Sequence, residues 1–157
     1  MHLNSLSARE WGKALGLGAA NGIALSVVMV TMMKLGASPL PKPLGLAFAE
    51  TLTGRSLPLP VGLLFHLAYV TFWSMAFVAF FRNRLTLCNA LILAFVLWLV
   101  VLVVFFPLVG WGVFGLAVGP QLSVGTFVSH LLFGLFLWGL CRVFFPRPAA
   151  NTEAATR

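Results

Sequence analysis

Apolar residues in this chain come in four long runs, each bounded by charged residues or proline. A helix that crosses a membrane needs about 20 mostly apolar residues, because the hydrocarbon layer is about 30 Å thick and each helical residue rises about 1.5 Å. The pattern predicts membrane-spanning helices at about 14–33, 61–81, 87–106 and 124–141. The predicted fold class is therefore an all-α integral membrane protein, a four-helix up-down transmembrane bundle that forms a single domain over residues 1–157.

The connection between the first two runs is rich in proline and contains a short amphipathic stretch at about 44–52. Pro43 stands where proline is favoured, in the first turn of a helix. Leu44, Phe48 and Leu52 would share one face of that helix. We expect this segment to lie in the outer membrane interface as an amphipathic outer loop.

The connection after the third run is apolar and glycine-rich from Pro107 to Gly115. We expect the third helix to end at Pro107, because proline cannot continue the helical hydrogen-bond ladder. Lipid cannot satisfy backbone amides, so irregular backbone at this depth must be buried against protein. The segment is predicted to form a Gly-rich outer cap over the bundle mouth, with Trp111 and Phe114 as interface anchors.

The composition excludes several classes of protein. The chain is 61% hydrophobic and 8% charged, whereas soluble domains carry about 25% charged residues. A net charge of +7 would suggest a nucleic-acid partner in a soluble protein, but here the basic residues stand singly or in pairs between apolar runs. With three acidic residues and no aspartate, hydrolysis and phosphoryl transfer have almost no groups to use. We therefore expect neither an enzyme nor a nucleic-acid partner.

The basic residues also predict the orientation. Lys34, Lys42 and Arg55 fall on one side of the predicted bundle, and the other seven fall on the opposite side. Those seven are Arg9, Lys13, Arg82, Arg84, Arg142, Arg147 and Arg157. The positive-inside rule then places both termini in the cytoplasm. The first run is too long for a cleaved signal peptide, so we expect it to be retained.

Two ionisable residues, His66 and His130, lie inside the predicted spans. Such residues are costly in a membrane and are therefore candidates for function. Each lies about six residues from the start of its helix, roughly 8–9 Å below the outer boundary. The second and fourth helices of an up-down bundle are parallel and diagonal, so the two imidazoles are expected to face each other at one level.

Three interpretations of this pair stay open. Two neutral histidines can simply satisfy their hydrogen bonds inside the bundle. Two facing imidazoles also suit haem b, and the same pair could hold a metal ion or a quinone-type molecule. Tyr69 lies on the face of His66 and Gly134 on the face of His130, so both are weaker candidates for cofactor contacts. Gly134 leaves room for either a flat macrocycle or a close helix.

Other polar and sulfur-containing residues are secondary candidates. Glu50 could reach the depth of the two histidines and carry protons there, although a position in the hydrated membrane interface is favoured. Asn21 and Asn89 are predicted to form hydrogen bonds between helices. Four methionines could supply thioether ligands for Cu(I), but packing is the commoner role of methionine. They are Met29, Met32, Met33 and Met75.

Several short motifs resemble a group of small four-span bacterial inner-membrane proteins defined only as a domain of unknown function. The first run ends in Val-Met-Val-Thr-Met-Met, and the proline-rich amphipathic loop is followed by His66 early in the second run. Pro-Leu-Val-Gly-Trp-Gly-Val-Phe-Gly follows the third run, and His130-Leu-Leu-Phe-Gly134 lies in the fourth. The likeness covers most of residues 14–145. It implies a bacterial inner membrane and a four-helix fold, and it brings no activity with it.

The leading functional hypothesis is a non-catalytic accessory subunit of a larger membrane complex, for example a respiratory one. The shortage of catalytic groups and the aromatic-rich composition favour contact with a membrane-protein partner or a second copy of the chain. The alternative is an electron-transfer protein that binds haem b or a metal through His66 and His130. A homo-oligomeric channel or transporter ranks last, because no predicted helix carries a row of polar residues.

Overall fold

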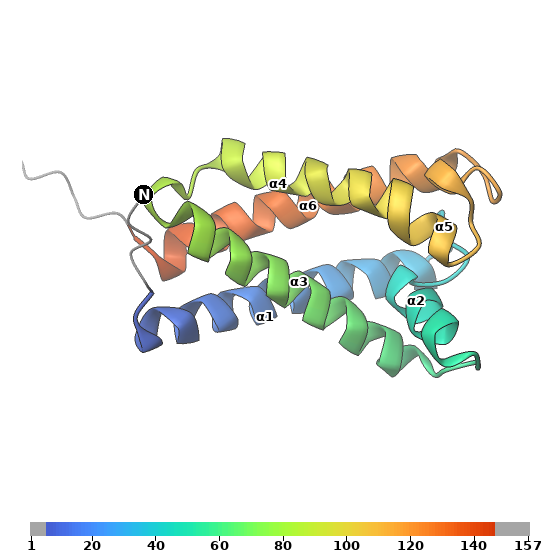
Figure 1. Cartoon of the computed structure of the whole chain (residues 1–157), viewed down its shortest axis with the longest axis horizontal. Coiled ribbons are helices and arrows are strands. Elements are labelled where there is room, and N and C mark those ends of the chain that lie inside the picture. Colours follow the sequence, from blue (N-terminus) through green and yellow to red (C-terminus); the bar gives the residue numbers. More distant parts are fainter. Residues whose placement is uncertain (1–5, 147–157) are drawn as a thin grey trace, which may run out of the picture.

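The computed structural model describes residues 6–146, which are helical and contain no strand (Figure 1). Four helices in this part of the chain are long and apolar enough to cross a membrane. They confirm the predicted all-helical, multi-pass membrane protein. The first, second and fourth are α1 (Ala8–Lys34), α3 (Leu59–Phe81) and α6 (Gln121–Phe144). The third consists of α4 (Leu87–Val100), the π-helix η2 (Val101–Phe105) and α5 (Phe106–Leu108) in succession.

The four long helices alternate in direction along the long axis of the molecule (Figure 1). The end that carries the start of α1, the end of α6 and the 3-10 turn η1 (Arg82–Arg84) is called the η1 end here. The opposite α2 end carries α2 (Leu44–Thr53), α5 and η3 (Val113–Gly115). Five of the seven basic residues predicted to share one side lie at the η1 end, and Arg147 and Arg157 lie outside the described residues. The five are Arg9, Lys13, Arg82, Arg84 and Arg142.

α1 and α3 form a close pair because glycines on α1 let the two backbones approach. A Cβ atom on Gly18 would lie 2.9 Å from the Cα and carbonyl oxygen of Thr71, and Gly22 faces α3 one turn further on. Small residues four positions apart are typical of close helix packing in membranes. Between them, Asn21 donates its Nδ2–H to Ser74 Oγ at 3.3 Å. The prediction that Asn21 bonds between helices is confirmed.

α4 and α6 form the second close pair. A Cβ atom on Gly134 would lie 3.2 Å from both the Ala90 carbonyl oxygen and the Ala94 Cβ. Of the two alternatives predicted for Gly134, the close helix is the one found. The prediction for Asn89 was wrong, because its Nδ2–H donates to the Arg84 carbonyl at 2.8 Å. Asn89 stands in the first turn of α4, where the carbonyls of the preceding turn are the nearest acceptors.

The third long helix continues one residue past the predicted end at Pro107. The π-helix η2 immediately before this proline explains the difference. In η2 the Phe106 N–H donates to the Val101 carbonyl, five residues earlier. Proline lacks an N–H and its ring clashes with the carbonyl four residues earlier, so a wider turn at this point accommodates it without ending the helix.

α2 packs across α3 through backbone contact. A Cβ atom on Gly45 would lie 2.6 Å from the Gly62 carbonyl oxygen. The side chains that α2 buries are the small ones of Ala47 and Ala49, while Leu52 is 63% exposed. The predicted helix is confirmed, and the close backbone contact explains why small side chains fill its interface with α3 while Leu52 stays exposed.

The glycine-rich connection after α5 folds back onto the α2 end. Trp111 is only 8% exposed, and its ring centroid lies 5.5 Å from that of Phe106. Trp111 is therefore a core side chain, and its prediction as an interface anchor was wrong. Phe114 is 44% exposed and has a positive φ of 57°, which matches a residue at the tip of a tight turn.

Candidate functional site

The α2 end of the bundle contains a cavity of about 660 Å³. Its walls come from α1, α2, α3, η2, α6 and the connection at 37–40. Toward the η1 end its floor includes Leu25, Val70, Leu97 and Phe133, which belong to the packed apolar core. Sites for small molecules and cofactors usually have volumes of about 300–1,000 Å³. The cavity is therefore large enough to hold such a molecule.

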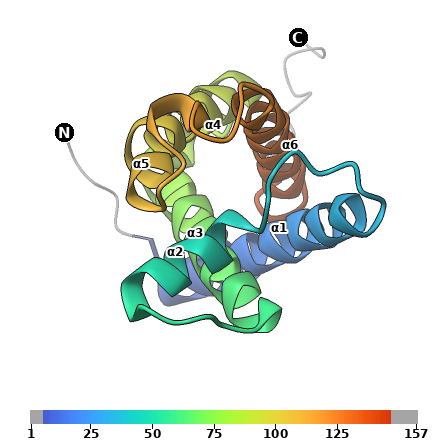
Figure 2. The same ribbon diagram turned by 90° about the vertical axis from the view of Figure 1, so that its right-hand side faces the viewer.

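The cavity reaches the lateral surface of the bundle between α1 and α6. Three of its lining residues on these helices are also exposed: Met32 at 44%, Val124 at 66% and Val128 at 51%. The connection between α1 and α2 runs over the near end of α6 (Figure 2), where Pro39 packs directly on Gly125. Gln121 and Ser129 are exposed lining residues too, but most side chains around this opening are apolar. It therefore faces the hydrocarbon layer when the helices cross a membrane.

His66 lines the cavity from α3. Its Nδ1 lies 3.1 Å from Ser26 Oγ on α1. A hydroxyl can donate or accept, so both neutral tautomers of the ring satisfy this contact. When Ser26 donates, Nε2 carries the proton, and when Ser26 accepts, Nε2 carries a lone pair. His66 can therefore offer either a donor or an acceptor.

His130 lines the cavity from α6. Its Nδ1 lies 2.7 Å from the carbonyl oxygen of Thr126, one turn earlier on the same helix. A carbonyl only accepts hydrogen bonds, so Nδ1 carries the proton and Nε2 of the neutral ring has a free lone pair. Histidines that bind metals are commonly oriented by the same kind of bond.

Neither Nε2 atom has a hydrogen-bond partner among the described residues. The buried polar side-chain atoms without a partner in that part of the chain are Asn21 Oδ1 and Tyr69 Oη. Both Nε2 atoms are therefore accessible. Because α3 and α6 begin earlier than predicted, His66 and His130 lie about 11 Å and 14 Å from the starts of their helices, compared with the predicted 8–9 Å. The structure nevertheless brings both imidazoles into the wall of one cavity.

The ring of Tyr69 lines the cavity, while its hydroxyl is buried away from it. The ring meets Phe105 edge to face, with centroids 5.7 Å apart. Phe105 in turn meets Phe48 at 5.2 Å, and Phe48 meets Phe65 at 6.2 Å. All four rings line the cavity. Tyr69 therefore contributes to an aromatic wall rather than offering a polar contact.

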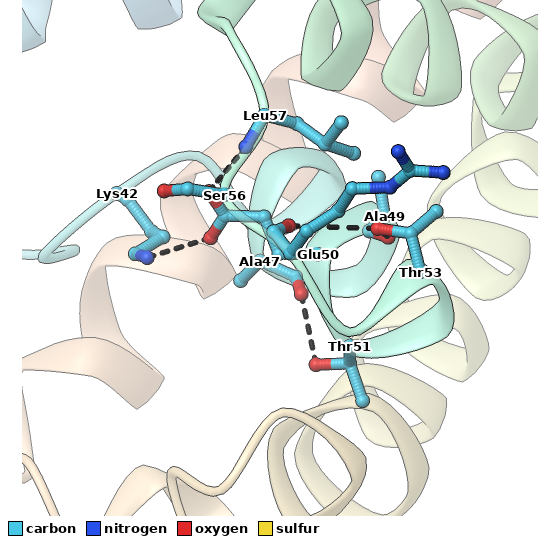
Figure 3. A network of polar contacts seen from close by, with 9 residues as sticks. Lys42, Ala47, Ala49, Glu50, Thr51, Thr53, Ser56 and Leu57 are labelled. Carbon is cyan, nitrogen blue, oxygen red and sulfur yellow. Dashed lines mark hydrogen bonds and ion pairs between the residues drawn. The ribbon is translucent and has the colours of Figure 1, made fainter.

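Glu50 lies in a polar network beside α2 and is not among the cavity-lining residues (Figure 3). Its Oε2 accepts from Lys42 Nζ at 2.7 Å, and its Oε1 accepts from the Leu57 amide at 3.1 Å and from the Ser56 hydroxyl at 3.4 Å. The hydrogen bond from Lys42 is the main reason why the pKa of this carboxyl lies below its ordinary value. The ionised carboxylate therefore binds the segment before α2, through Lys42, and the segment after it, through Ser56 and Leu57.

A metal ion would find few ligands here. No group of three or more His, Cys, Asp and Glu side chains able to hold one occurs within residues 6–146. Met29 and Met32 line the cavity beside the histidines, whereas Met33 and Met75 are not among its lining residues. The available set is two imidazoles and two thioethers, which suits only a soft ion such as Cu(I). Gly134 is also absent from the cavity wall.

Sequence reasoning missed the two residues that orient the imidazoles. Ser26 follows Gly18 and Gly22 at intervals of four residues, and this spacing places its hydroxyl on the face of α1 that packs against α3. Thr126 precedes His130 by four residues, which is the spacing of a hydrogen bond to the previous turn. Both signals are present in the sequence, but the distance between Ser26 and His66 depends on how the helices cross.

In comparisons with known proteins, no protein-family model, no curated protein and no solved structure matched the chain. Function therefore has to be inferred from the cavity and from the side chains that line it.

Proposed function

We propose that the protein is a non-catalytic subunit of a membrane complex and holds a small, largely apolar molecule between His66 and His130. The observation that carries this proposal is a pair of histidines from two different helices that line one cavity of about 660 Å³, each with an Nε2 that has no hydrogen-bond partner among the described residues. Polar side chains inside membrane spans are costly to keep. Two that converge on a cavity support a binding role better than a packing role.

The shortage of other reactive groups supports the non-catalytic part of the proposal. Among the described residues the two carboxylates are Glu10 and Glu50, and each is engaged in an ion pair. Glu10 pairs with Arg82 at the η1 end, and Glu50 pairs with Lys42 at the α2 end. Acid–base chemistry in the cavity would therefore depend on the two imidazoles alone.

The proposed setting is a bacterial inner membrane with both termini in the cytoplasm. The cluster of basic residues at the η1 end supports this orientation, and it puts the cavity, with α2 and the glycine-rich cap, in the outer half of an up-down bundle. A C-terminal fusion to green fluorescent protein should fluoresce, and a C-terminal alkaline phosphatase fusion should be inactive. The opposite pattern would reverse the orientation.

Haem b is a second candidate ligand, supported by a specific observation. Each Nδ1 already has a hydrogen-bond partner, so Nε2 is the atom left to ligate iron. A reduced-minus-oxidised spectrum of protein from its native membrane would then show a sharp α-band. The band would be lost in His66→Ala and in His130→Ala. A flat spectrum would contradict haem as the ligand, and the molecule bound in the cavity would then be a colourless one.

A channel receives less support. The floor of the cavity is continuous with a core that includes the buried side chains of Leu17, Phe77 and Leu137. These lie toward the η1 end and fill the bundle with apolar side chains. A conduction path would have to replace this packing with polar groups or water. The arrangement supports a binding protein whose cavity is closed toward the η1 end.

The proposal is tested by isolating the tagged full chain from its native membrane without added ligand. Solvent extracts and co-purifying proteins are compared for the wild type, His66→Ala, His130→Ala and a control, Thr51→Ala. Thr51 is not among the cavity-lining residues, and its hydroxyl donates to the Ala47 carbonyl at 2.9 Å. We expect a small molecule in the wild type and control that is lost from both histidine variants. Identical extracts from all four proteins would contradict the proposal.

A further inference from the structure

The polar groups that the cavity leaves free define what a ligand must offer. The hydroxyls of Thr126 and Ser129 donate to carbonyls of their own helix at 2.8 Å and 3.1 Å, and the Tyr69 hydroxyl is closed off. Gln121 and Ser38 also line the cavity, at the start of α6 and in the connection before α2. The side-chain nitrogens left free deeper in the bundle are the Nε2 atoms of His66 and His130. The nitrogen of His130 is an acceptor, and that of His66 can be an acceptor or a donor. A complementary ligand therefore carries two hydroxyl-type donors on opposite sides.

The walls indicate the body of this ligand. Phe48, Phe65, Tyr69 and Phe105 form a run of edge-to-face aromatic contacts along the cavity. Such walls favour a planar ring, because aromatic pairs gain more than simple burial provides. The lateral opening between α1 and α6 is lined mainly by apolar side chains. It suits an apolar tail that stays in the lipid while the ring enters the bundle.

We infer that the ligand is a lipid-soluble quinol, an aromatic ring with two opposed hydroxyls and an apolar tail, and that the site prefers it to the corresponding quinone. This inference rests on the proposed function. One hydroxyl donates to the Nε2 of His66 and the other to the Nε2 of His130. A quinone has only acceptors, so one of its carbonyls would face the lone pair of His130.

The two histidines differ in how they respond to a quinone. His66 can change tautomer, because the Ser26 hydroxyl accepts or donates equally well. His130 cannot, because the Thr126 carbonyl requires a proton on Nδ1. When the ligand is oxidised, the hydrogen bond to His66 can still form and the one to His130 cannot. The preference for the reduced form therefore depends on His130. A metal ion would use neither the aromatic wall nor the lateral opening.

The test measures binding of decylubiquinol and decylubiquinone to the full chain in lipid nanodiscs, under anaerobic conditions, by titration calorimetry. One hydrogen bond contributes about 0.5–1.5 kcal/mol, so we expect quinol to bind roughly 2- to 13-fold more tightly than quinone. His130→Ala should remove this preference, and Thr51→Ala, outside the cavity, should keep it. A quinol with the same ring but no tail should bind more weakly than decylubiquinol. Circular dichroism checks that each variant retains its helices.

Several results would overturn the inference. Equal affinity for the two oxidation states, or an unchanged preference in His130→Ala, would contradict the role given to His130. A histidine-dependent haem band together with no decylubiquinol binding would mean that the protein holds a ligand and that the quinol assignment is wrong. If no histidine-dependent molecule co-purifies and neither probe binds, the proposed function is wrong as well.

Discussion

The contact between α1 and α3 allows a sharp test of how the bundle is held together. In Gly18→Ala, the new Cβ would lie 2.9 Å from the Cα and carbonyl oxygen of Thr71. Both atoms belong to the backbone, so the helices must move apart to make room. Overpacking of this kind costs about 1–3 kcal/mol. The gain in helix propensity from glycine to alanine is about 1 kcal/mol, which leaves an expected net destabilisation of about 0–2 kcal/mol.

Two other glycines on the same helix provide graded controls. A Cβ on Gly22 would meet the Cδ1 of Leu67 at 2.6 Å, but that atom is the end of a flexible side chain and can rotate away. A Cβ on Gly16 would meet only a ring carbon of Phe144 at an ordinary 3.7 Å. The expected order of destabilisation is therefore Gly18→Ala, then Gly22→Ala, with Gly16→Ala neutral or slightly stabilising.

The assay is equilibrium unfolding by titration with sodium dodecyl sulfate in mixed micelles, followed by circular dichroism. All three alanine variants have the same change in side-chain volume and lie on one helix, so differences between them report the local space. If Gly18→Ala is no less stable than Gly16→Ala, the close approach of α1 and α3 is not what stabilises this pair of helices.

Three further predictions concern polar groups away from the cavity opening. The pKa of Glu50 is lowered, so its network stabilises the folded state fully above the ordinary carboxyl value of 4.5, and this stabilisation is lost as the pH falls through the lowered pKa. Hydrogen exchange of the Leu57 amide should therefore accelerate at that low pH. An exchange rate that does not depend on pH, after correction for the intrinsic rate, would contradict this. Tyr69→Phe removes a buried hydroxyl that has no partner among the described residues, so the variant should be at least as stable as the wild type, by up to about 1 kcal/mol in detergent unfolding. Arg82→Gln breaks a partly exposed ion pair with Glu10. Exposed pairs contribute little to stability, so the midpoint of detergent unfolding should stay close to that of the wild type, and a large downward shift would be inconsistent with such a pair.

Most of the fold could be predicted from the sequence, because a membrane imposes simple rules. Length, hydropathy and charged ends are enough to place four helices, since every spanning segment must satisfy its own backbone. The errors occur where packing decides. Pro107 does not end its helix, because a π-turn accommodates it, and Trp111 is buried by a chain reversal that the residue types alone do not reveal.

The candidate site was predictable in part. His66 and His130 stand out because ionisable residues are rare in apolar helices, and helix length alone places them at similar depth. The lateral opening was not predictable, since it depends on where the connection at 37–40 crosses α6. The role of Tyr69 also depends on packing, because one phenol can present either its ring or its hydroxyl. Here the ring lines the cavity and the hydroxyl is covered.

The two histidines look equivalent in the sequence, yet their partners make them chemically different. His130 is oriented by its own helix, so its tautomer persists as long as α6 remains helical. His66 is oriented by Ser26 on a neighbouring helix, and α1 holds Ser26 in place through the glycine contact with α3. Ser26 lies eight residues from Gly18, about 12 Å along the helix axis. Moving the helices apart at Gly18 should therefore lengthen the 3.1 Å contact and weaken ligand binding at His66, while the Thr126 bond that sets the acceptor at His130 stays intact.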